Sequence, residues 1–168
     1  MRNNTRRLAQ VSLIISFALI LSFIESRIPA FVAIPGVKVG LANIAVIFML
    51  YKFGVKEAIT VSLIRVLIVA LLFGSPVSLF YSISGAVLSF VVMLVLKKLT
   101  PLKEVTVSVA GGVMHNVGQI LVAIFLLNTP QIAYYMIVLA VTGTISGILV
   151  GLCGAYLIKK SNLARFLK

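Results

Sequence analysis

Six runs of apolar residues, separated by short stretches that contain proline or glycine, constrain the fold of this chain more than any other feature. A helix that crosses a bilayer needs about 20 apolar residues, so the second and third runs are short. The sequence predicts one all-α domain over residues 1–168, a polytopic membrane protein with six transmembrane helices. The runs cover approximately residues 8–24, 39–53, 58–73, 77–96, 105–127 and 132–158.

The composition agrees with a membrane location. Of the 168 residues, 61% are hydrophobic and only 11% are charged, which leaves too little polar surface for a soluble domain of this length. The net charge is +12, but the basic residues form short clusters between the apolar runs and no continuous stripe. This distribution is typical of loops on the cytoplasmic side of a membrane. We therefore expect the chain to contact the lipid bilayer and no nucleic acid.

The distribution of basic residues also predicts the orientation. If all six runs cross the membrane, twelve lysines and arginines fall on one side and only Arg27 and Lys38 on the other. Loops that stay in the cytoplasm carry the excess of Lys and Arg. We therefore expect a multi-pass protein of the cell membrane with both termini in the cytoplasm.

An arginine interrupts the third apolar run. Arg65 lies midway along this run, between Ile64 and Val66. An arginine at the centre of a bilayer costs about 2.5–3.5 kcal/mol on insertion scales, so its side chain needs a cavity, a carboxylate or carbonyl groups. Glu25, at the outer end of the first run, is the carboxylate best placed to pair with it. Both a ligand-binding role and a purely structural role for Arg65 remain open.

Further polar residues lie in the second and fifth runs. His115 and Gln119 are four residues apart and share one helix face, Asn116 lies on the adjacent stripe, and Asn43 lies early in the second run. In the predicted topology these groups gather in the middle and outer half of the membrane, which indicates a pocket open to the outside. A histidine that only bonds a neighbouring helix is the alternative. The predicted substrate-binding residues are Glu25, Arg27, Lys38, Asn43, Arg65, His115, Asn116 and Gln119.

Small residues recur at four-residue spacing in several runs. Gly143, Gly147 and Gly151 follow this spacing in the last run, and Ser12 and Ser16 in the first. Such stripes let helix backbones approach closely. Packing within the monomer and docking of a partner protein both fit the pattern, and Ser12 and Ser16 are the best candidates for docking.

Several residue types that catalysis would need are missing from the sequence. The chain has no aspartate, one histidine (His115) and one cysteine (Cys153). These residues cannot supply a Ser-His-Asp set, paired histidines for zinc, or the carboxylate clusters with which prenyl diphosphate synthases hold magnesium. No glycine-rich Lys-Ser/Thr phosphate loop occurs either. We therefore expect no catalytic residues, no metal and no cofactor, and a protein that is not itself an enzyme.

Three stretches of the sequence resemble a known family. They read ESRIPAFVAIPGVKVGLANIAVIFMLYKFGVKEAITVSLIRVLIVALLFG, FYSISGAVLSFVVMLVL and VAGGVMHNVGQILVAIFL, with PGVKVGLAN and HNVGQ the most specific parts. Over about residues 8–158 the chain resembles the Gx transporter family, also described as heptaprenyl diphosphate synthase component I. That family is similar in turn to the substrate-binding S components of energy-coupling factor (ECF) transporters.

The resemblance implies a role in uptake. S components are six-helix bundles with cytoplasmic termini that capture a small molecule from outside and dock on a coupling subunit and ATPases. Ser12 and Ser16 match the small residues that typically make this dock. The resemblance thus predicts an S component with a small-molecule substrate. An ion-coupled carrier that uses Glu25 and His115 for protons, and a non-catalytic membrane partner of a prenyl diphosphate synthase, are the alternatives.

Overall fold

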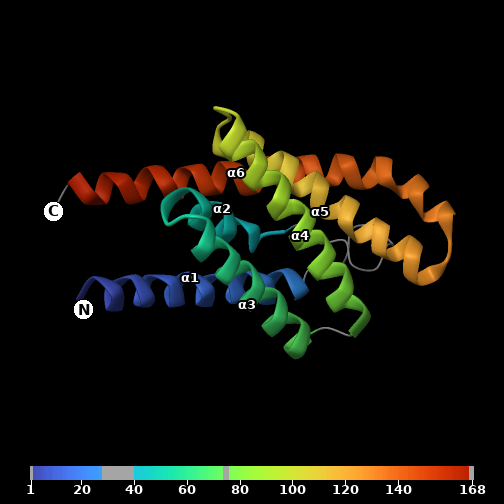
Figure 1. Ribbon diagram of the computed structural model, residues 1–168, viewed down its shortest axis with the longest axis horizontal. Coiled ribbons are helices and arrows are strands. Elements are labelled where there is room, and N and C mark those ends of the chain that lie inside the picture. Colours follow the sequence, from blue (N-terminus) through green and yellow to red (C-terminus); the bar gives the residue numbers. More distant parts are fainter. Residues whose placement is uncertain (1, 28–39, 74–75, 167–168) are drawn as a thin grey trace.

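The computed structural model describes the backbone of residues 2–27, 40–73 and 76–166, and the side chains of residues 5–27, 40–72 and 76–161. All regular structure in these ranges is helical, as Figure 1 shows, which confirms the predicted all-α class. The helices are α1 (Arg2–Arg27), α2 (Asn43–Lys52), α3 (Val55–Phe73), α4 (Pro76–Leu99), α5 (Glu104–Leu127) and α6 (Met136–Phe166), with a 3-10 helix η1 (Pro130–Tyr135) before α6.

The helices follow the apolar runs, with differences at the ends. The second run forms a helix only from Asn43, and the sixth begins with the 3-10 helix η1. Asn128 ends α5 in the left-handed conformation, with φ of 50°. Asparagine tolerates this conformation better than most residues, and it commonly terminates helices. Pro130 then occupies the start of η1, where its missing N–H group leaves no bond unmade.

Among the described residues, four helical segments are long and apolar enough to cross a membrane, namely Thr5–Arg27, Pro76–Leu99, Glu104–Leu127 and Pro130–Ser161. This supports a membrane protein. The helix α2 has 10 residues, which corresponds to about 15 Å, half the thickness of the hydrocarbon core. The helix α3 has 19 residues but carries Lys56, Glu57 and Arg65. Crossing of the membrane by α2 and α3 therefore stays a prediction.

The helix α5 packs most extensively against α4 and α6. Glycines allow the close approach of α5 and α6: a Cβ atom added to Gly112 would lie 2.5 Å from the carbonyl oxygen of Gly143. One added to Gly147 would lie 2.6 Å from the Cα atom of Val109, and one added to Gly151 would lie 2.7 Å from that of Val105. The predicted glycine stripe of the last run thus packs within the monomer.

The hydrophobic core surrounds the short helix α2, which contacts α1, α3, α5 and α6. Ile47, Met49 and Leu50 of α2 are among the largest fully buried side chains, together with Val61 and Val107. By contrast, α1, α4, α5 and α6 expose many large apolar side chains. A helix that is buried in protein does not need to match the thickness of the bilayer, whereas exposed apolar faces are suited to lipid contact.

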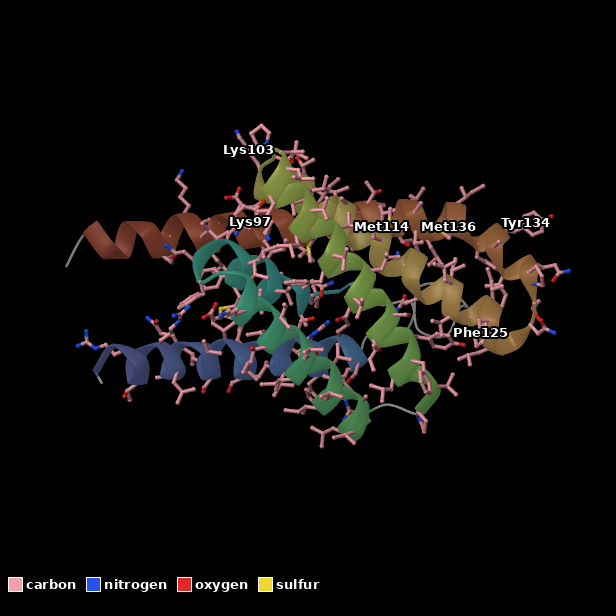
Figure 2. All side chains as sticks on the ribbon, viewed as in Figure 1. Lys97, Lys103, Met114, Phe125, Tyr134 and Met136 are labelled. Atoms are coloured by element: carbon pink, nitrogen blue, oxygen red, sulfur yellow. The ribbon has the colours of Figure 1, made fainter. Side chains whose placement is uncertain are left out.

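The molecule has two chemically different ends. Both termini lie at the same end of the bundle (Figure 1). Lys97 and Lys103 lie in the half nearer the termini, whereas Phe125 and Tyr134 lie at the opposite end (Figure 2). At the basic end Arg7 of α1 forms an ion pair with Glu57 of α3. Lys97 of α4 donates a hydrogen bond to the carbonyl oxygen of Leu50, near the end of α2.

Candidate functional site

A polar pocket lies where α1, α3, α4 and α5 meet beside the beginning of α2. Its cavity volume is about 40 Å³. That space is enough for a few water molecules or for a solute of a few non-hydrogen atoms. Its lining residues are Ser22, Glu25, Gly40, Asn43, Arg65, Val66, Val69, Ser82, His115 and Gln119.

Two buried side chains of opposite charge dominate the pocket. Glu25 of α1 is 6% exposed and Arg65 of α3 is 9% exposed. The Glu25 carboxylate and the Arg65 guanidinium interact electrostatically. The Nε atom of Arg65 is buried without a hydrogen-bond partner in the part of the chain that the structure describes. Buried charged groups are normally fully bonded, and the described residues leave part of this guanidinium unsatisfied.

Gly40 connects this charge pair to the beginning of α2. Its backbone N–H group donates a hydrogen bond to Oε1 of Glu25, and its carbonyl oxygen accepts one of 2.8 Å from the backbone of Asn43. The φ angle of Gly40 is +78°, in the left-handed region that favours glycine. A Cβ atom at this position would also lie 3.0 Å from Nδ2 of Asn43. Glycine is therefore the residue that best fits this corner of the pocket.

The helix α5 contributes His115 and Gln119 from one face, as their four-residue spacing predicts. Nε2 of Gln119 lies 3.4 Å from Nε2 of His115, and the tautomer of the imidazole decides which group donates. Gly85 of α4 leaves the space that this histidine occupies. A Cβ atom on Gly85 would lie 2.8 Å from the carbonyl oxygen of His115 and 2.9 Å from its ring.

The structure brings together five of the predicted site residues and places two others, Asn116 and Arg27, outside the pocket lining. Glu25, Asn43, Arg65, His115 and Gln119 line the pocket. Asn116 points to α6, where its Nδ2 atom donates a 2.7 Å hydrogen bond to the carbonyl oxygen of Leu139. Arg27 is exposed, with its guanidinium carbon 5.0 Å from the centre of the Phe23 ring. Lys38 lies outside the described residues.

Sequence reasoning missed five other lining residues, Ser22, Gly40, Val66, Val69 and Ser82. Helical spacing could have found two of them, because Ser22 lies one turn before Glu25 and Val69 one turn after Arg65. Ser82 belongs to a stripe of small residues that resembles a packing surface. Nothing in the sequence shows that this stripe faces a pocket.

A second and smaller pocket lies between α2, α4, α5 and α6 and shares Asn43 with the first. Its cavity volume is about 20 Å³. Ser89 of α4 and Ser108 of α5 line it and are buried. Since buried hydroxyl groups usually bond protein or ordered water, one or two water molecules fit this chamber well.

The chemistry available in these pockets is that of binding. Within the described ranges, no three His, Cys, Asp or Glu residues lie close enough to hold a metal ion. The guanidinium, the carboxylate, the imidazole, the two side-chain amides and the two hydroxyl groups of the larger pocket suit recognition by hydrogen bonds.

The predicted docking residues lie elsewhere, on an outer face of α1. Ser12 and Ser16 are exposed, and Oγ of Ser16 donates a 3.1 Å hydrogen bond to the carbonyl oxygen of Ser12. The exposed side chain of Leu13 lies between them in the sequence. The surface is accessible to a partner, and its role in docking stays a prediction.

Comparison with known proteins gives one match. The model of the family described as heptaprenyl diphosphate synthase component I matches residues 14–157. The matched range includes all the residues that line the two pockets. No curated protein and no solved structure matches the chain.

Proposed function

The chain belongs to the heptaprenyl diphosphate synthase component I family, and from this premise we propose that it is the substrate-binding component of an uptake transporter in the cell membrane. It captures a small polar molecule from the outer side in the pocket that Glu25 and Arg65 line. Partner subunits then supply the energy for transfer inward. The observation that carries this proposal is a buried charge pair beside a pocket, with the Nε atom of Arg65 unsatisfied.

The energetic cost of burying charged side chains in this pocket favours a binding role. Ionisable residues inside a membrane protein are expensive, and they usually mark a path or a site for a ligand. Here the charged and polar groups come from α1, α2, α3, α4 and α5, which converge on one small space. If Arg65 served only stability, the folded protein would be more stable with every N–H group of the Arg65 side chain bonded to protein atoms.

The S-component assignment adds an orientation and partners. The position of both termini at one end and the basic character of that half support cytoplasmic termini and six crossings, with α2 buried among the other helices (Figures 1 and 2). The sequence has no phosphate-binding loop, so ATP hydrolysis belongs to partner ATPases. The exposed face of α1 with Ser12 and Ser16 docks on the coupling subunit.

The family description favours one other function. A protein named as component I of a prenyl diphosphate synthase could be the non-catalytic membrane partner of a separate catalytic subunit. This function would need no ligand in the pocket. An ion-coupled carrier is a third candidate, favoured by the presence of Glu25 and His115 in one pocket.

Gentle purification tests the proposal. The protein is extracted into lipid nanodiscs and examined by native mass spectrometry for a retained small molecule, and the eluate is searched for a coupling subunit and ATPases. We expect both. Arg65→Gln should lose the small molecule, whereas Arg27→Gln, which removes an exposed charge outside the pocket, should retain it. Recovery of a prenyl diphosphate synthase subunit with no bound small molecule would instead support the synthase-partner function.

A further inference from the structure

We propose that the pocket selects solutes of zero net charge, either uncharged or zwitterionic, and that Glu25 sets this selectivity by cancelling the charge of Arg65. This inference rests on the proposed function, because it assumes that the pocket binds a small molecule. It goes further in naming the chemical class of the ligand and a residue that determines specificity.

The first step is the charge of the lining. Among the described residues that line the pocket, Arg65 is the only base that is always charged and Glu25 the only acid. Their charges cancel, and His115 adds none in its neutral form. An anion or a cation in this pocket would therefore leave one uncompensated charge among buried groups. Such a charge is costly in a low-dielectric interior, and the cost discriminates against charged solutes.

The second step is the repulsion that an anion would meet. Glu25 lines the same small pocket as Arg65, accepts a hydrogen bond from the backbone of Gly40 and interacts electrostatically with Arg65. An anion at Arg65 would share this pocket with the Glu25 carboxylate, and the two negative charges would repel each other. An uncharged carbonyl group can accept from the guanidinium without this repulsion.

The third step is the complement of hydrogen-bonding groups. The side chains of Ser22, Asn43 and Ser82 line the pocket and form no hydrogen bond within the described part of the chain. Hydroxyl and amide groups both donate and accept, so they suit a neutral solute with several polar atoms. The apolar side chains of Val66 and Val69 complete the lining and offer a solute only van der Waals contact.

Charge-swapped variants and a set of small probes test the inference. The probes are acetamide (uncharged), glycine (zwitterionic), acetate (anionic) and methylammonium (cationic). Their binding to the protein in nanodiscs is measured at pH 8, where an unperturbed imidazole is neutral, by calorimetry and by thermal stability. We expect acetamide and glycine to bind the natural protein at least tenfold more tightly than acetate or methylammonium.

The variant Glu25→Gln removes the negative charge of residue 25 and keeps a side chain of nearly the same shape. Its amide oxygen can still accept from Gly40, but the charge of Arg65 is no longer cancelled. We expect acetate to bind this variant at least tenfold more tightly than it binds the natural protein. Glu57→Gln is the matched control, since it removes the acid of the Arg7–Glu57 ion pair far from the pocket lining and should leave the order of the probes unchanged.

Two results would overturn the inference and leave the binding function intact. One is acetate binding the natural protein as tightly as acetamide and glycine do. The other is an unchanged affinity for acetate in a folded Glu25→Gln variant. If that variant does not fold, the order of the four probes on the natural protein decides. Weaker binding of both acetate and methylammonium than of acetamide supports charge cancellation, and tight binding of either ion contradicts it.

Failure of the underlying function has a different signature. In that case no probe binds the natural protein or its variants, and native mass spectrometry finds no retained molecule. That outcome rejects the binding pocket together with its selectivity. A retained molecule that carries a net charge, by contrast, rejects the selectivity alone.

Discussion

At the scale of single residues, neighbours in the sequence have different tasks in this protein. His115 lines the pocket, whereas the next residue, Asn116, is buried against α6 and donates to the carbonyl oxygen of Leu139. The two side chains lie about 100° apart around the helix axis, which is enough to direct them to different neighbours. A polar motif in a membrane helix therefore contains both binding and packing residues.

Substitution of these neighbours should separate the two tasks. Asn116→Ala removes a buried hydrogen bond to the carbonyl oxygen of Leu139, which still accepts from the Thr142 hydroxyl, so we expect a loss of about 0.5–1.5 kcal/mol in stability and unchanged ligand affinity. His115→Ala should weaken ligand binding about tenfold with a smaller loss of stability. Thermal unfolding and calorimetry with the retained ligand measure both quantities. Equal loss of affinity in the two variants would contradict this assignment.

Gly40 allows a second prediction at this scale. Gly40→Ala places a side chain at a φ of +78° and close to Asn43, so we expect a loss of about 1–3 kcal/mol in stability and weaker ligand binding. Gly54 is the matched control, because it has a φ of +118° and lies outside the pocket lining. Gly54→Ala should lower the melting temperature and leave the affinity unchanged. A Gly40→Ala variant that binds the ligand with unchanged affinity would show that Gly40 does not contribute to the binding site.

At the scale of the elements, helical periodicity predicts which residues share a face but not which helix that face meets. The spacing of His115 and Gln119 correctly placed them on one face, and Glu25 and Arg65 share the pocket as their charges suggest. Ser82 was missed because a serine on a small-residue stripe looks the same whether it faces a helix or a cavity. Arg27 lies outside the pocket lining and is exposed, because a charge at a helix end reaches solvent easily.

The contact of α5 with α6 gives a prediction at this scale. A Cβ atom on Gly112 meets the backbone of Gly143, which cannot move aside. One on Gly111 meets the side chains of Met93 and Ser89, and methionine adapts readily. We therefore expect Gly112→Ala to cost about 1–3 kcal/mol and Gly111→Ala clearly less. Thermal unfolding of the two variants in the same detergent compares them directly, and the reverse order would show that the helices are packed differently.

At the scale of the whole molecule, the two ends of the bundle differ as the two sides of a membrane do. Figure 2 shows Lys103 toward the end with the termini and Tyr134 at the opposite end. The apolar runs and the basic clusters predicted this polarity from the sequence. The sequence showed that the second run is short, but not that protein covers the helix α2, because hydropathy does not show whether an apolar run is covered by lipid or by protein.

Cysteine labelling tests the orientation. Cys153 is the only cysteine, so Cys153→Ser provides a background without thiols. We expect an impermeant maleimide to label Tyr134→Cys in intact cells, and to label Lys103→Cys only after the membrane is permeabilised. Labelling of Lys103→Cys in intact cells would show that the orientation is opposite to the predicted one. The pocket would then open to the cytoplasm.

The short, buried helix α2 also has a consequence for biosynthesis. Ten residues are too few for stable insertion into a bilayer on their own, so α2 depends on the helices around it. One of these is α6, which is made after α2, and a Cβ atom added to Gly154 of α6 would lie 2.8 Å from Ile47 of α2. Final docking of α2 thus has to wait until α6 has been made. Because Asn43 at the beginning of α2 is shared by both pockets, the binding site takes its final form only after the synthesis of α6.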